Sequence, residues 1–491
     1  MGFTSTASKR LILAAAIAGL FGASTAPAFA DMETLLDKLH EKGVLSDEDY
    51  QQMRTEARAD RRTQALKEAQ EQEQKQHPPA ADTGKFKVAD AIKSMELFGD
   101  LRLRYEDRIA TSPSDFNFDR QRWRYAFRIG VRGDIADDFF YGLRLDTGTY
   151  GRSAWVTYGD DNRQAGSGKT AQANKTNDAM NVGLAYLGWK PTSWLQIIGG
   201  RQPNPLYTTP MVWDPDITPE GLVEKASFKL TDNLNTFLTA GQFIYQDFSG
   251  PSTHDSSLSV GRQDLMLYSF EAGANYKLGA ESALKGAINY YTYAGGQTTA
   301  DFRSTFTGSG TGYAGNIGVN DLEVVEIPLE FRFPIASYSG LLYANLAKNL
   351  KGSDRATRAG FSNFGDQDKA YQVGFSLGSQ GIPQGAGTGA VYGNSAKKGT
   401  WETRVYWQRI EQFALDPNMI DSDFFERTNL EGWFLAAAYS PADAIITTLR
   451  YGQAKRYNNN LGTGGFNDDS SGLAASINKY KLAQFDVTLR F

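Results

Sequence analysis

The sequence predicts an all-β membrane protein, a closed antiparallel up-and-down transmembrane β-barrel of about 16 strands with a short N-terminal periplasmic helical segment. Three observations predict this fold. Apolar and polar residues alternate with a period of two in sixteen stretches after Met95, which is typical of strands with one apolar face. Short turns and long polar loops take turns between these stretches. Hydrophobic residues are only 41% of the 491-residue chain, and no apolar run beyond the N-terminus could form a helical span.

Residues 1–30 have the features of a secretory signal peptide. Lys9 and Arg10 precede an apolar run, and the run ends in Ala28-Phe29-Ala30, an A-x-A cleavage pattern. We therefore expect export and cleavage before Asp31. A short anchor helix is the alternative, but the run is too short to span a bilayer comfortably. The chain contains no cysteine, which excludes a disulfide framework and any thiolate site.

Residues 31–76 differ from the rest of the chain because their apolar residues follow a helical spacing. A first helix ends near Gly43, and a second begins at Ser46, with Asp49 three residues later as in a capping box. The second helix is too polar to bury a core alone, so we expect a solvated or weakly self-associating, coiled-coil-like segment. A specific cell-wall contact is the alternative. Residues 77–94 are the expected linker and 95–491 the barrel.

The first two predicted strands show how the barrel faces differ. In "LFGDLRLRYE" and "RWRYAFRIGVR", leucines and aromatic residues occupy one face and arginines the other. Fourteen further stretches follow the same scheme. The sixteen are centred near residues 101, 127, 144, 186, 197, 227, 240, 271, 289, 328, 345, 374, 406, 437, 450 and 486.

The connections between the predicted strands alternate in length. Short turns lie at 134–138, 190–193, 231–233, 278–282, 335–340 and 440–443, and long loops at 106–120, 149–180, 202–221, 247–263, 296–321, 351–368, 414–431 and 457–478. An up-and-down membrane barrel has this pattern because one rim carries tight turns and the other long loops. The interval 381–399 is long where a tight turn is expected. It contains either an insertion or an extra hairpin, which leaves the strand number open by two.

The last predicted strand explains why the chain ends on an aromatic residue. An unpaired strand edge in hydrocarbon costs several kcal/mol per exposed backbone group, so the last strand must pair with the first. We expect the alternating apolar face of this strand to contact outer-membrane lipid. A terminal aromatic after such a face also resembles the signal that barrel assembly machinery reads. The residues of this expected assembly signal are Phe485, Val487, Leu489 and Phe491.

Three stretches resemble the Gram-negative outer-membrane family described as "Putative porin". They are the helical "LLDKLHEKGVLSDEDYQQM", "GRQPNPLYTTPMVWDPDITPEGL" (200–222) and "MIDSDFFERTNLEGW" (419–433). The resemblance implies an outer-membrane barrel that transports solutes passively, with the solute left open. Porins of this size resemble homo-trimers.

The third long loop, 202–221, is the predicted pore constriction. Five prolines stiffen it, and in a barrel of about sixteen strands an inward loop usually narrows the lumen. The expected constriction residues are Trp213, Asp214, Asp216 and Glu220. The expected facing basic row on the first two strands is Arg102, Arg104, Arg122, Arg124, Arg128 and Arg132. Opposed charges would set a transverse field that sorts solutes. Alternatively, both sets only keep the lumen wet and pair with each other.

Other classes of function find little support in the sequence. A net charge of −5 without a basic block gives no reason to expect nucleic-acid binding. None of the three histidines lies on a predicted strand, so we expect no catalytic set, no cofactor and no metal site. The favoured function is passive diffusion of small hydrophilic solutes and ions through a water-filled channel. A barrel sleeve or scaffold for an envelope or electron-transfer complex is the second candidate, and a tether to the cell wall is the third.

Overall fold

The computed structural model describes residues 91–111, 117–148, 153–159, 178–247, 264–295, 319–381, 385, 396–421, 423–424, 427–463 and 477–491. The chain divides into two compact units, Met1–Val88 and Ala89–Phe491. All described residues belong to the second unit. The predicted signal peptide, the predicted helical segment 31–76 and most of the predicted linker therefore lie outside the described residues.

Strands dominate the described part of the chain. The strands are β1 (Glu96–Thr111), β2 (Asn117–Asp134), β3 (Phe139–Thr147), β4 (Val156–Thr157), β5 (Met180–Thr192), β6 (Leu195–Arg201), β7 (Glu220–Lys229), β8 (Leu234–Gln246), β9 (Leu265–Lys277), β10 (Ala283–Ala294), β11 (Glu323–Ile335), β12 (Tyr338–Asn349), β13 (Lys369–Ser379), β14 (Trp401–Ile410), β15 (Leu430–Ala442), β16 (Ile445–Arg456) and β17 (Lys479–Arg490). A short helix α4 (Gly352–Arg358) and a 3₁₀ turn η1 (Ser362–Phe364) lie between β12 and β13. No helix among the described residues is long and apolar enough to cross a membrane.

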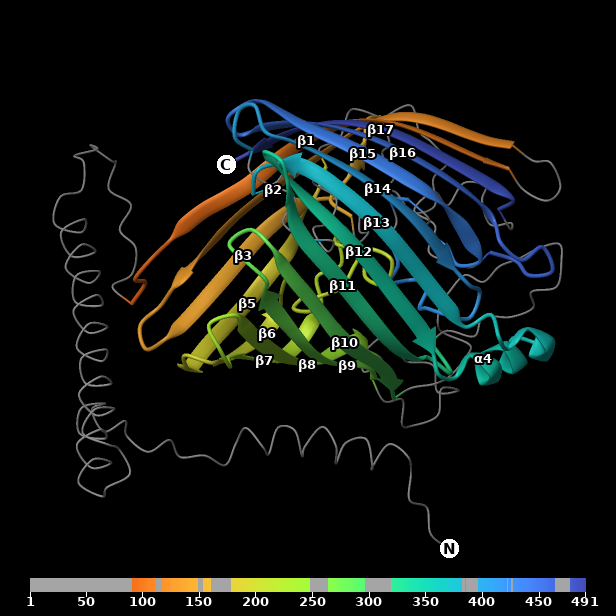
Figure 1. Ribbon diagram of the computed structural model, residues 1–491, viewed down its shortest axis with the longest axis horizontal. Coiled ribbons are helices and arrows are strands. Elements are labelled where there is room, and N and C mark those ends of the chain that lie inside the picture. Colours follow the sequence, from red (N-terminus) through yellow and green to blue (C-terminus); the bar gives the residue numbers. More distant parts are fainter. Residues whose placement is uncertain are drawn as a thin grey trace, which may run out of the picture. The chain divides into compact units, whose positions relative to one another are not determined.

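The strands form one closed antiparallel barrel (Figure 1). Successive strands are hydrogen-bonded neighbours, and β17 pairs with β1 in the register Leu489↔Leu101. The two-residue β4 pairs with β2 at Val156↔Tyr125, beyond the point where the β2–β3 ladder ends. Because β4 continues the line of β3, sixteen strands go around the barrel. The predicted closed antiparallel barrel of about 16 strands and the predicted pairing of the last strand with the first are confirmed.

Each of the sixteen predicted stretches lies in a separate strand. The long interval at 381–399 adds none to the sheet, because β13 and β14 pair directly with each other, as at Phe375↔Val405. Gly385, inside this interval, is buried, and its carbonyl oxygen accepts a hydrogen bond from Arg404 Nη2 at 3.1 Å. Gly385 therefore lies against the inner wall, and residues 382–384 and 386–395 of this interval lie outside the described residues.

The barrel has an apolar outer face and a polar inner face. On the outer face, Trp123 is 57% exposed and Trp433 61%. On the inner face, Glu326 and Asn345 are fully buried among other polar groups. A membrane barrel needs this arrangement because one face contacts hydrocarbon and the other the lumen. The rim with the tight turns is called the short-turn end below, and the opposite rim the long-loop end.

Candidate functional site

The connection between β6 and β7 leaves the barrel wall early. Strand β6 has 7 residues, whereas β5 beside it has 13. Prolines at 203, 205, 210, 215 and 219 end the ladder here, because proline has no backbone N–H to donate. Gly200 has a φ of 116°, and a Cβ there would lie 2.3 Å from the carbonyl oxygen of Ala185, so the departure point needs glycine. Residues 202–219, called the first inward loop below, then turn into the lumen.

Polar side chains of the facing wall hold the first inward loop. The backbone N–H of Tyr207 donates to Glu271 Oε2 at 2.6 Å. Thr208 Oγ1 donates to Glu326 Oε1 at 2.6 Å, and Asn345 Nδ2 donates to Thr209 Oγ1 at 2.7 Å. These anchors come from β9, β11 and β12, so the loop extends inside the barrel past the strands next to β7. Sequence reasoning did not identify Glu271, Glu326 and Asn345 as loop anchors, although the sequence shows that they are polar residues on the inward-facing positions of their strands.

Trp213 anchors the same loop through apolar packing. Its ring is almost fully buried and lies 5.9 Å, centroid to centroid, from Phe243 in an edge-on arrangement. Tyr291 lies 6.5 Å away. Of the predicted constriction residues, Trp213 is thus placed against the wall, where it fixes the position of its acidic neighbours.

The described residues of 411–429, between β14 and β15, belong to a second inward loop that sequence reasoning did not assign to the pore. Its Asp416 carboxylate accepts hydrogen bonds from the hydroxyls of Tyr245 and Tyr293 at 2.7 and 2.8 Å. The ring of Phe424 packs between wall aromatics. The available signal was the stretch 419–433, which was read only as a family marker.

The two inward loops are hydrogen-bonded to each other. The backbone N–H of Asp214 donates to the carbonyl oxygen of Met419 at 2.6 Å. The backbone N–H of Asp421 donates to the carbonyl oxygen of Pro210 at 3.1 Å. The two most distinctive sequence stretches of the chain therefore meet inside the barrel.

Four aspartates gather where the loops meet: Asp214, Asp216, Asp421 and Asp423. Burial and the nearby carboxylates of Asp214 and Asp423 raise the pKa of Asp421 well above its usual range. Burial and Asp423 also raise the pKa of Asp216, although Arg128 and Arg104 oppose this shift. Burial alone would raise the pKa of Asp423, but Arg104 and Arg450 outweigh it and lower that pKa to about 2. The cluster therefore faces arginines of the wall.

Arg104 connects the acidic cluster to the wall. Its Nη1 lies 2.8 Å from Asp423 Oδ1 on the second inward loop, and its Nε lies 2.8 Å from Asp486 Oδ1 on β17. The guanidinium carbon is 4.0 Å from the centroid of the Trp155 ring. Arg450 also pairs with Asp486. A buried charge network thus joins β1, β16, β17 and the loop.

The other predicted arginines are also paired. Arg102 and Arg128 both bind Asp100, at 2.9 and 2.7 Å. Arg122 binds Glu106 at 2.5 Å, and Arg124 Nη1 lies 3.8 Å from the same carboxylate. The row on β1 and β2 is therefore interleaved with acids, which sequence reasoning did not assign to the site.

Two predicted site residues lie away from the cluster. Arg132 binds Glu96 at 2.8 Å near the short-turn end, where its side chain is half exposed. Glu220 is exposed at the start of β7 and binds Arg201 at 2.5 Å. The structure brings Asp214 and Asp216 to the second inward loop and leaves Glu220 at the base of the first.

The predicted assembly signal lies on the outer face of the closing strand. Phe485, Leu489 and Phe491 are 41–48% exposed. Val487 pairs with Leu103 on the same face. The N–H of Gly99 donates to the carbonyl oxygen of Phe491 at 2.8 Å, so the terminal residue belongs to the seam.

Comparison with known proteins agrees with the barrel. The sequence profile of the family described as "Putative porin" matches residues 112–314, about two fifths of the chain. No curated protein matches. The predicted resemblance to this family is confirmed over residues 112–314. This range includes the stretch 200–222, and the other two stretches that predicted the resemblance lie outside it.

Solved porin structures align at low similarity. A structure described as "Asymmetric conductivity of engineered proteins" has 12% identity and a TM-score of 0.38. Two variants of the porin of Rhodopseudomonas blastica have 11% and 12% identity and TM-scores of 0.36 and 0.37. Each alignment covers 81% of this chain and 100% of the other. Because these TM-scores are below 0.5, the fold assignment depends on the strand pairing of the chain itself.

Proposed function

We propose that this chain is an outer-membrane porin that lets small hydrophilic solutes and ions diffuse passively through a water-filled channel. The observation that supports it is a closed barrel with a polar inner face, into which two loops fold and meet. A large barrel leaves an aqueous lumen, and inward loops reduce its cross-section and set its selectivity. The partial match to the porin family also favours a channel over an enzyme.

The proposed constriction lies at the meeting point of the two inward loops. Asp216 and Asp423 supply negative charge on the loop side. Asp421 adds a further charge only when the pH rises through its raised pKa. Arg104 and Arg128 supply positive charge on the wall side. Trp213 and Asp214 hold the first loop in place. Charges of opposite sign across a narrow passage orient polar solutes and sort ions.

The sleeve and scaffold candidates fit the lumen less well. A sleeve must leave room for a protein inside the barrel. Here the first inward loop crosses to β9–β12, and the second closes against it. The described lumen therefore suits small solutes better than a folded partner.

The location and assembly of the chain are part of the same proposal. We place the barrel in the outer membrane of a Gram-negative bacterium, with the signal peptide removed and residues 31–76 in the periplasm. The aromatic face of β17 is the proposed contact for the barrel assembly machinery. A homo-trimer is supported by polar groups on the outer face of β7 and β8, where Gln242 Nε2 lies 3.4 Å from Glu224 Oε1. A carboxyl among outward-facing apolar residues is costly beside lipid.

Planar-bilayer recording of the purified full chain tests the proposal. We expect stepwise conductance in KCl and a reversal potential in asymmetric salt that depends on the charged residues above. A chain that shows heat-modifiable migration, and is therefore folded, but gives no conductance would contradict the proposed function. A chain starting at Ala91 should also conduct, because the described barrel is complete without the preceding residues.

A further inference from the structure

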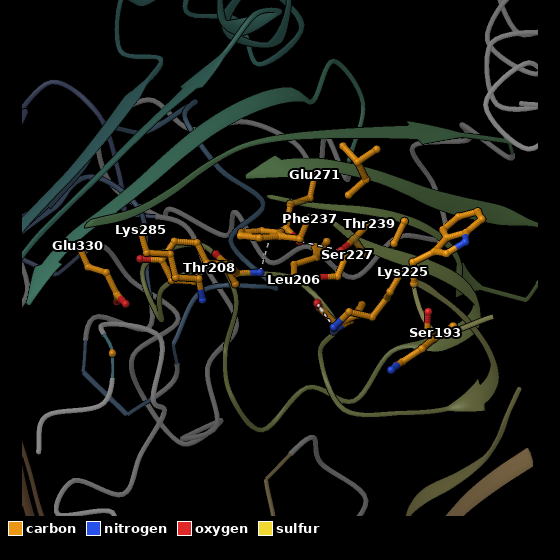
Figure 2. A pocket seen from close by; sticks show the side chains of 17 residues that line it. Ser193, Leu206, Thr208, Lys225, Ser227, Phe237, Thr239, Glu271, Lys285 and Glu330 are labelled. Carbon is orange, nitrogen blue, oxygen red and sulfur yellow. Dashed lines mark hydrogen bonds between the residues drawn. The ribbon is translucent and has the colours of Figure 1, made fainter. Parts of the chain in front are cut away.

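A cavity of about 510 Å³ lies inside the barrel, between the first inward loop and the short-turn end (Figure 2). Loop residues 205–208 form one side of it. The other walls come from Ser193 in the turn between β5 and β6, and from the short-turn halves of β6–β11, including Gln196 and Ser227. Binding sites for small molecules have volumes of roughly 300–1,000 Å³. The cavity is therefore large enough for a solute that has passed the constriction.

Two lysines enter this cavity, and neither forms a direct ion pair with a described residue. Glu271 attracts both ammonium groups and Glu330 attracts that of Lys285, in each case at longer range. Lys225 Nζ donates to the carbonyl oxygen of Pro205 at 3.0 Å. Lys285 Nζ lies 3.8 Å from the centroid of the Tyr207 ring and 5.6 Å from that of Phe237. Within the described part of the chain, neither ammonium group forms an ion pair. An ammonium group has three donors, so both lysines can still bind an anion.

The carboxylate of Glu271 is already committed to the protein. Its Oε1 accepts from Thr239 Oγ1 at 2.8 Å, and its Oε2 accepts from the Tyr207 N–H at 2.6 Å. Glu330 lies at the edge of the cavity opposite Lys285 in the strand register. Figure 2 shows Lys285 and Lys225 on opposite sides of the view, with Glu271 above the loop residue Leu206. The charged groups of this cavity with donors left over are the lysines.

The remaining lining suits hydroxyl groups and a short carbon skeleton. Ser193, Gln196 and Ser227 each offer a donor and an acceptor. Leu206 and Phe237 supply apolar surface between them. Side chains that both donate and accept hydrogen bonds, beside a smaller apolar surface, can bind a polyhydroxylated chain or ring.

We propose that this cavity is a binding subsite for small hydroxylated carboxylates of the sugar-acid class, with Lys225 and Lys285 holding the carboxylate. The proposal rests on the porin function and names its solute class. An anion here neutralises two ammonium groups that lack ion pairs, which is favourable in a site partly shielded from water. The neutral polar groups then select hydroxylated anions over simple ones.

Calorimetric titration of the detergent-solubilised full chain tests binding without requiring conduction. The probes are gluconate, glucose, glucosamine and acetate. We expect gluconate to bind at least ten times more tightly than the other three, because it alone combines the hydroxyls with a negative charge. Lys225→Gln with Lys285→Gln should weaken gluconate binding at least tenfold. The matched control is Lys229→Gln with Lys277→Gln, which removes two exposed charges at the same end and should bind like the parent.

Glucosamine binding equal to or tighter than gluconate binding would overturn the proposal, because the carboxylates would then dominate the cavity. Unchanged gluconate binding in the Lys225 and Lys285 variant would overturn it as well. If the double variant fails to show heat-modifiable migration, the single variant Lys285→Gln decides, with a loss of at least threefold expected. Bilayer recording separates the two claims. Conduction without gluconate binding contradicts the subsite alone, and binding without conduction contradicts the porin function alone.

Discussion

Arg104 shows how single residues fix the interior of the barrel. Its guanidinium is fully buried and contacts Asp486 on the wall and Asp423 on the second inward loop. Removing one partner of a buried ion pair costs about 3–5 kcal/mol, because the other charge is left without compensation. The second inward loop is therefore attached to β1 by an interaction that is expensive to break. The depressed pKa of Asp423, about 2, keeps it ionised through neutral pH.

Asp216 and Glu220 allow a matched test of the constriction. Asp216→Asn removes a negative charge near Arg104 and Arg128, so we expect the reversal potential in asymmetric KCl to shift toward anion selectivity. The shift should be largest at low salt, where the screening length is about 30 Å at 0.01 M. Glu220→Gln removes the same charge from the exposed loop base, where Arg201 pairs with it, and should change selectivity much less. Equal shifts in both variants would place the constriction elsewhere.

Asp421 predicts a pH-dependent selectivity. Burial and the carboxylates around it raise its pKa well above the usual 3.8. The folded channel therefore keeps this carboxyl neutral at pH values where a free aspartate is ionised. As the pH rises through the raised pKa, a negative charge appears and the permeability ratio should move toward cations. Asp421→Asn keeps the acceptor for the Asp423 N–H and should lack this step, as measured by reversal potentials across a pH series.

The same shift has a consequence for stability. A carboxyl with a raised pKa in the folded state favours folding below that pKa, and its contribution declines as the pH rises above the unfolded value. Asp421→Asn should therefore gain stability relative to the parent as the pH increases. An identical pH profile for both proteins, in unfolding and in selectivity, would show that Asp421 does not titrate in this way.

At the scale of elements, the sequence predicts the strands, but it predicts only in part where the loops lie in the barrel. A period of two is a local property, so all sixteen barrel strands are visible in the sequence. The prolines of 202–219 predict where a ladder must end, and the structure shows that this loop enters the lumen. The second inward loop could not be inferred, because Asp416 and Phe424 find their partners on strands far away in the chain. The pairing of the arginine row likewise depends on strand register, which residue type alone does not reveal.

Shortening the first inward loop should widen the passage. Replacing residues 206–215 with a short glycine-serine link removes Trp213, Asp214 and the wall contacts of Thr208 and Thr209. We expect a higher single-channel conductance, because less of the lumen is filled. Trp213→Ala is the milder companion variant, which loses the packing on Phe243 but keeps the loop. This variant should give noisier currents and a smaller increase in single-channel conductance than the shortened loop. Parent-like conductance in both folded variants would contradict the constriction.

At the scale of the whole molecule, the outer face of β7 and β8 predicts a contact between copies. Glu224→Leu replaces a carboxyl on an outward position by a residue suited to lipid. If the carboxyl faces lipid in the monomer, this change should stabilise the barrel. If it lies in a trimer interface, as we propose, it should weaken the oligomer. Native mass spectrometry or crosslinking in mild detergent distinguishes the outcomes, and a trimer of unchanged stability would rule out this face. Leu238→Ile, on the same outer face, is the control.

Closure of the barrel depends on the seam between β1 and β17. The terminal Phe491 exchanges backbone hydrogen bonds with Gly99, and its ring lies where a Cβ on Gly99 would be, 2.7 Å away. A glycine covered by a neighbouring aromatic ring is a known device for fixing register at a barrel seam. The last residue of the chain therefore contributes to pairing as well as to the apolar outer face.

The depth of a charge on the closing strand should decide whether the barrel assembles. Phe485→Arg places a cation on the outer face about midway along β17, where it costs about 2–4 kcal/mol, falling to about 0–1 near the interfaces. Lys481, on the same face four residues nearer the long-loop end, is exposed and charged in the parent, so Lys481→Arg is the matched control. We expect Phe485→Arg and deletion of Phe491 to lower outer-membrane levels and heat-modifiable migration, and Lys481→Arg to leave both unchanged. If Phe485→Arg assembles like the parent, this face does not contact hydrocarbon, because an arginine without an acidic partner is costly there.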